Sequence, residues 1–159
     1  MFSIGDTVVY PAYGAGVIVD IETVQIGSKT GTYYVMDLPN VNLKVRLSVD
    51  KAEEAGLREI YSENKLLEAI SVVKDIPVEN YGNWNQRYKD NLEKVKTGHI
   101  EKVALVYRNL YLREREKGLS GAEKKMLNNT RHIIVSEIIL SCGMKKDEAE
   151  KYLARVLFG

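Results

Sequence analysis

The sequence of 159 residues contains a single cysteine, three prolines and one tryptophan, and these scarcities exclude several classes of protein. Cys142 has no second thiol with which to form an internal disulfide, and one free cysteine fits a reducing compartment. The amino-terminal residues lack the basic and apolar segments of a secretory signal peptide, and the longest apolar runs are too short to span a bilayer. We therefore expect a cytoplasmic protein with no membrane partner.

The sequence also lacks the residue patterns of common catalytic and metal sites. His99 and His132 have no cysteine or carboxylate at ligand spacing, and Cys142 follows an apolar run rather than a general base. Neither a phosphate-binding loop nor a nucleophile elbow is present, so Gly14 and Gly16 are best interpreted as turn glycines. We expect no enzyme, no cofactor, no metal and no small-molecule substrate.

The net charge is close to neutral, but the charge is unevenly distributed along the sequence. Residues 1–76 contain 7 Lys and Arg against 11 Asp and Glu, whereas residues 77–159 contain 16 against 11. An acidic part joined to a basic part suggests one partner that is a protein and another that is a polyanion.

The acidic part is predicted to form strands. Segments rich in β-branched and aromatic residues are separated by glycine and proline, and they cover residues 7–10, 16–26, 32–36 and 43–49. Short antiparallel strands with tight turns favour a small β-barrel of the SH3 or Tudor type. A helix at 64–74 is expected to close this domain, which we place at residues 1–74.

Alternation in the last predicted strand separates its two faces. Leu43, Val45 and Leu47 are expected to point inward, and Lys44 and Arg46 outward. Most outward arginines are only solvated, but Arg46 would be displayed on a rigid element.

The basic part is predicted to be all-helical. Pro77 disfavours the helical conformation for the residue before it, so residues 75–82 are predicted as a linker and residues 83–159 as a domain of about four helices. The first helix starts at Trp84, and the others cover 100–117, 121–141 and 146–157. Gly118 and Gly143 suit helix ends, and Ser120 with Glu123 forms a capping box.

Trp84 is expected at the first position of its helix, because Asn83 suits an N-cap and Gln86 a capping-box partner. Two interpretations of the indole remain open. It either continues the apolar stripe of Tyr88, Leu92 and Val95 into the core, or leans back past the packed body, as first-turn side chains do.

Cations lie near this tryptophan and on a second helix. Arg87 and Lys89 follow Trp84, and Lys124, Lys125 and Arg131 recur at helical spacing on the predicted helix 121–141. Such cations either form a solvated face or hold phosphates while an apolar side chain enters a base step.

Several segments carry a family likeness that spans the whole chain. They are Gly5–Pro11 with Gly14, residues 43–46, Asn83-Trp84 with residues 87–89 and 91–94, and residues 118–120 with 123–124 and 126–127. In this order the segments resemble the CarD/CdnL transcription regulators of bacteria. The resemblance differs at Gln86, where members of the family often have a cation, and at Val24, where some have an arginine.

The resemblance implies a fold and two partners. The Tudor-like domain, shared with transcription-repair coupling factors, would bind the β subunit of RNA polymerase through Arg46 and Lys44. The helical domain would contact promoter DNA weakly at the upstream edge of the bubble, with Trp84 as a wedge in the minor groove. By position, the resemblance adds Arg87, Lys89 and Lys124 as DNA contacts, and the cations at helical spacing described above add Lys125 and Arg131.

We therefore expect a non-enzymatic regulator that docks on RNA polymerase and stabilises the open promoter complex. The alternative is a protein-interaction adaptor that docks on the polymerase and makes no direct contact with DNA.

Overall fold

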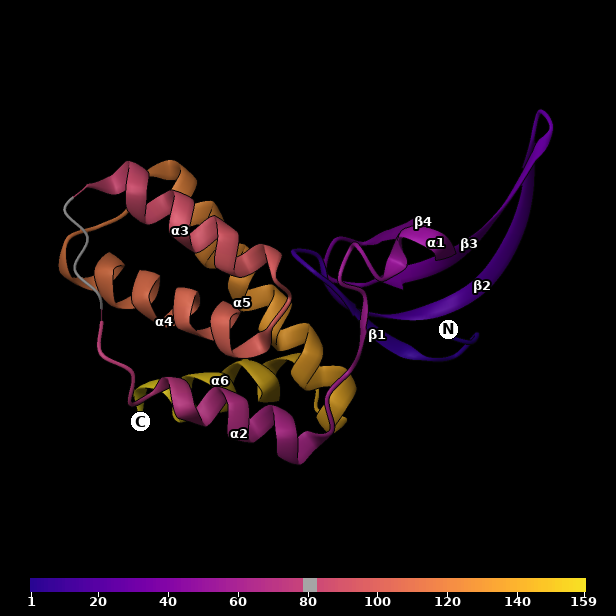
Figure 1. Cartoon of the computed structure of the whole chain (residues 1–159). Helices are drawn as coiled ribbons and strands as arrows, with labels where there is room; N and C mark the ends of the chain where they lie inside the picture. Colours follow the sequence, from indigo (N-terminus) through magenta and orange to yellow (C-terminus); the bar gives the residue numbers. More distant parts are fainter. Residues whose placement is uncertain (79–82) are drawn as a thin grey trace.

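A five-stranded antiparallel sheet forms the first part of the molecule in the computed structural model, which describes residues 1–78 and 83–159 (Figure 1). Its strands are β1 (Thr7–Tyr10), β2 (Gly14–Ile26), β3 (Lys29–Leu38), β4 (Leu43–Ser48) and β5 (Arg58–Glu59), in the order β4-β3-β2-β1-β5. The four predicted strands are confirmed. The sheet is not a closed barrel, however, because two-residue β5 pairs only with β1 and leaves β4 as the opposite edge.

The sheet has its own apolar core. Val8, Ile18, Met36 and Leu38 are fully buried in it, and α1 (Val49–Ala52) contributes Ala52. Gly16 allows β2 and β3 to approach closely, since a Cβ there would lie 2.3 Å from the carbonyl oxygen of Asp37. The predicted burial of Leu43 is wrong: this residue is 60 % exposed, because it begins an edge strand with a neighbour on only one side.

Five longer helices form the second part. They are α2 (Glu63–Val73), α3 (Trp84–Lys96), α4 (Ile100–Glu116), α5 (Gly121–Cys142) and α6 (Lys146–Phe158). Asn83 caps α3 as predicted, since its side chain accepts from the Gln86 N–H at 2.8 Å. The Gln86 side-chain amide donates to Asp90, one turn further along. Ser120 caps α5, and Gly143 ends it in the left-handed conformation.

Helix α2 packs with the other helices rather than with the sheet, and this corrects its predicted place. Its apolar face, Leu66, Ile70 and Val73, is fully buried in the same cluster as α4, α5 and α6. The Arg108 guanidinium of α4 also donates to the carbonyl oxygens of Val73 and Ile76 at the end of α2. Of the predicted linker 75–82, residues 79–82 lie outside the described residues.

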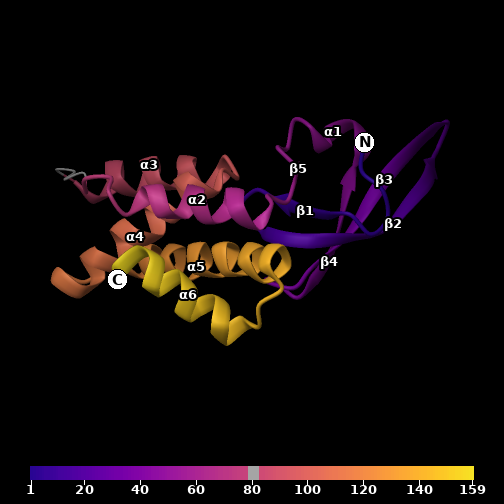
Figure 2. The same cartoon turned by 90° about the horizontal axis from the view of Figure 1, so that it is seen from below.

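Helix α5 belongs to the helical part and also packs against the sheet. It runs the length of the helical layer and brings its second half against β2, as both views show (Figure 1, Figure 2). The starts of α3 and α5 therefore lie at the end of the molecule farthest from the sheet.

Candidate functional site

Trp84 is an exposed aromatic residue at the start of α3. Its side chain is 45 % exposed, and its ring lies 5.8 Å from the ring of Tyr88, one turn further along. Tyr88 and Leu92 are half-buried and Val95 is buried, so the apolar stripe enters the core only after the first turn. The structure thus agrees with the second interpretation, in which the indole projects past the packed body.

A buried ion pair fixes the helix that carries Trp84. The Arg87 Nε atom lies 2.8 Å from Glu123 Oε2, and a terminal guanidinium nitrogen lies 3.0 Å from Oε1. Arg87 is 9 % exposed and Glu123 1 % exposed. The hydrogen bonds from Arg87 hold the pKa of the Glu123 carboxyl below its usual value despite burial. This pair joins the first turns of α3 and α5.

The ion pair changes the role that sequence reasoning gave to both residues. Arg87 was predicted to contact DNA, but a buried guanidinium held by a carboxylate is not free to meet a phosphate. Glu123 was assigned only to the capping box, where its carboxylate does accept from the Ser120 hydroxyl. Because Arg87 lies far from Glu123 in sequence, only packing of the two helices could reveal the pair.

Three of the predicted cations are exposed near the Trp84 end. Lys89 lies on α3, and Lys124 and Lys125 lie on the first turn of α5. A groove between the two helices is lined by Tyr88, Leu92, Val95, Gly121, Ala122, Lys125, Met126 and Asn129. The exposed indole and the lysines therefore lie near one end of the helical layer, and the groove runs from there along α3 and α5 as far as Val95 and Asn129.

Arg131 lies apart from these lysines. It is six residues beyond Lys125, a rise of about 9 Å along the helix. It is half-buried, and its buried Nε atom has no hydrogen-bond partner among the described residues. Its neighbour is His132, whose pKa is lowered by burial first and then by the Arg131 charge. The structure does not bring Arg131 into the exposed cationic group.

Lys44 and Arg46 lie in the sheet part, on the edge strand β4. Both are exposed as predicted, and the Arg46 Nε atom donates to Glu22 on β2 at 2.9 Å. The Arg46 side chain remains 66 % exposed. With Val19, Asp20 and Val35 these residues line a shallow hollow on the sheet, so a partner would meet fixed charges of both signs.

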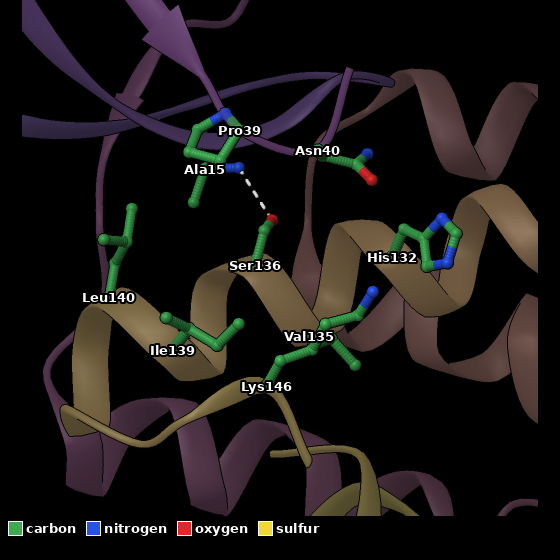
Figure 3. Close-up of a pocket in the computed structure, with 9 residues that line it drawn as sticks. All are labelled: Ala15, Pro39, Asn40, His132, Val135, Ser136, Ile139, Leu140 and Lys146. Carbon is green, nitrogen blue, oxygen red and sulfur yellow. Dashed lines mark hydrogen bonds between the residues drawn. The ribbon is translucent and has the colours of Figure 1, made fainter. Parts of the chain in front are cut away.

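A small cavity of about 200 Å³ lies where the sheet meets α5 (Figure 3). Its lining is mostly apolar and combines Ala15, Pro39 and Asn40 of the sheet part with His132, Val135, Ser136, Ile139, Leu140 and Lys146 of the helical part. Within the described residues there is no group of three His, Cys, Asp or Glu suited to a metal ion, and no helix is long and apolar enough to cross a membrane.

Comparisons with known proteins agree with this two-part arrangement. Residues 2–61 match the family model described as the CarD-like/TRCF RID domain, and residues 68–154 match the model of the CarD C-terminal domain. YdeB, a proposed transcription factor of Bacillus subtilis (strain 168), is 32 % identical over 152 residues, which cover 96 % of this chain and 99 % of YdeB. The chain therefore belongs to the CarD-like family of transcription factors.

Proposed function

We propose that the chain binds the β subunit of RNA polymerase through its sheet and contacts promoter DNA at the upstream edge of the bubble through its helical part. It would thereby stabilise the open complex. The observation that carries the DNA contact is the half-exposed Trp84, held at the helix start by a buried ion pair. A rigid apolar side chain of this kind suits insertion at an unstacked base step.

The charges support a weak contact with DNA that depends on the polymerase. Lys89, Lys124 and Lys125 are exposed on the same end as Trp84, and each suits a phosphate. Three exposed lysines at this end give little affinity for duplex DNA, so docking on polymerase would supply the local concentration. The proposed polymerase contacts are Arg46 and Lys44, on the rigid strand β4.

Trp84→Ala is the direct test of the wedge. A ligand shifts an equilibrium only if it binds one of the two states more tightly than the other. If the indole contacts only the melted promoter, its loss therefore shifts the equilibrium away from the open complex. We expect the substitution to destabilise the open complex by about 1–2 kcal/mol, which shortens its lifetime on a linear promoter roughly five- to thirtyfold. Since the side chain is half-exposed, the unfolding free energy should fall by less than the about 3–5 kcal/mol typical of a buried Trp.

Trp84→Phe is the matched control, because it keeps an aromatic wedge on the same turn. Its open-complex lifetime should stay closer to that of the unmodified protein. An unchanged lifetime for a well-folded Trp84→Ala variant would contradict the wedge and favour the adaptor function.

A further inference from the structure

The interface between the sheet and the helices is built around a second ion pair, far from Trp84. Two guanidinium nitrogens of Arg58 on β5 donate to the two carboxylate oxygens of Glu137 on α5, at 2.9 and 2.8 Å. Glu137 is 1 % exposed, and its carboxylate also accepts from the Tyr61 N–H. The Arg58 Nε atom donates to the carbonyl oxygen of Gly98, between α3 and α4. Arg58 thus joins three separate segments.

The chain that tethers the two parts is held at the same place. Only residues 60–62 separate β5 from α2. The Arg58 guanidinium lies 4.0 Å and the Lys65 ammonium 4.2 Å from the centroid of the Tyr61 ring. The Ser141 hydroxyl of α5 donates to the Tyr61 carbonyl oxygen at 2.7 Å. A short tether that is bonded along its length restricts hinge motion about it.

The hairpin between β1 and β2 makes a third contact with the helices. The Ala15 N–H donates to the Ser136 hydroxyl at 3.0 Å (Figure 3). The Asn129 amide donates to the Ala12 carbonyl oxygen. Gly98 allows Pro11 to pack closely, since a Cβ at Gly98 would lie 2.7 Å from the proline ring. The contacts of this hairpin and of Arg58 involve different strands, so together they oppose rotation as well as bending.

We infer that Arg58 and Glu137 are positioning residues that fix the orientation of the helical part on the sheet, and so set where Trp84 meets DNA once the sheet is docked on polymerase. The inference rests on the proposed function. Trp84 is the first residue of α3, and the start of α3 lies at the end of the helical layer remote from this interface (Figure 1). A small rotation at the interface is therefore a large displacement of the indole, and a misplaced wedge loses its contact.

The test is the double variant Arg58→Met/Glu137→Gln in the full chain. Removing both charges avoids a buried unpaired ion, and the glutamine keeps an acceptor for the Tyr61 N–H. Spin labels on cysteines introduced at the exposed positions Asp37 and Lys117, in a Cys142→Ser background, report the distance between the two parts. We expect a narrow distance distribution for the parent and a broad one for the double variant. Polymerase binding should be retained, and open-complex lifetime should be shortened by the same roughly five- to thirtyfold as in Trp84→Ala.

Glu59→Gln, a neutralised exposed carboxylate on the same strand, is the control and should behave like the parent. An unchanged distance distribution in the double variant would overturn the inference. Broadened distances with a normal lifetime would also overturn it, and would leave the proposed function standing if Trp84→Ala still shortens that lifetime. If neither variant changes the lifetime, the proposed function fails and the positioning role fails with it.

Discussion

At the scale of single residues, Glu123 determines how firmly the exposed indole is held. Its carboxylate meets Arg87 in a buried, two-bond ion pair, and removing one partner of such a pair leaves an uncompensated buried charge. We expect Glu123→Gln to lower the unfolding free energy by about 3–5 kcal/mol near neutral pH, as measured by denaturant titration. Glu116→Gln, at an exposed carboxylate of α4, should leave it nearly unchanged.

The pKa of Glu123 gives this loss a defined dependence on pH. Because the folded pKa lies below the unfolded value of about 4.3, the pair contributes its stability above that pH and loses it as the pH falls through the folded pKa. The difference in melting temperature between the parent and Glu123→Gln should therefore be largest near neutral pH and narrow in acid. A melting-temperature difference that is as large below about pH 4 as at neutral pH would contradict this assignment.

At the scale of elements, the first turn of α5 is the proposed phosphate contact. Lys124 and Lys125 are exposed there, and each phosphate neutralised by a cation adds close to one unit to the salt dependence of binding. We expect Lys124→Gln/Lys125→Gln to reduce the slope of log affinity against log salt by about two, measured on polymerase-bound promoter. Lys102→Gln/Lys151→Gln, at exposed lysines of α4 and α6, should leave the slope unchanged. Equal slopes for all three proteins would favour the adaptor without DNA contact.

The edge strand β4 is the element proposed to meet polymerase. Arg46→Glu reverses a charge that is 66 % exposed and forms a surface pair with Glu22, so the unfolding free energy should change by less than about 1 kcal/mol. Polymerase should nevertheless fail to co-purify with this variant, because the new carboxylate would repel the negative groups that the guanidinium is proposed to attract. Lys29→Glu reverses an exposed charge at the start of β3 and should co-purify normally. Undiminished binding by Arg46→Glu would move the interface elsewhere.

At the scale of the whole molecule, α2 decides where the chain can be divided. A fragment of residues 62–159 keeps Leu66, Ile70 and Val73, whereas a fragment of residues 83–159 loses them. Each fully buried aliphatic side chain contributes roughly 1.5–3 kcal/mol, and three together approach the total stability of a small domain. We expect the longer fragment to melt cooperatively in circular dichroism and the shorter one not to. Equal cooperative melts would show that α2 is dispensable.

The local structure follows from interactions between neighbours in the chain. Strand and helix positions follow from periodicity and from turn residues, and the caps at Asn83 and Ser120 are chemistry between neighbours in the chain. The first-turn position of Trp84 was likewise predictable, and with it the chance that the indole stays exposed. Such features depend on interactions over a few residues, which the sequence contains directly.

Tertiary structure decided which parts pack together and which charges remain free. Periodicity gives α2 an apolar face but does not say which core that face enters, and alternation does not close a sheet whose last strand has two residues. Arg87 and Lys89 look alike in sequence, yet only the first meets a carboxylate of another helix. Glu137 is a lone carboxylate in an apolar run, and this pattern indicates a buried carboxylate that needs a partner. The pattern does not identify the partner as Arg58, which lies 79 residues away. Pairings at such separations arise only when the chain folds, because burial and electrostatics depend on distance in space.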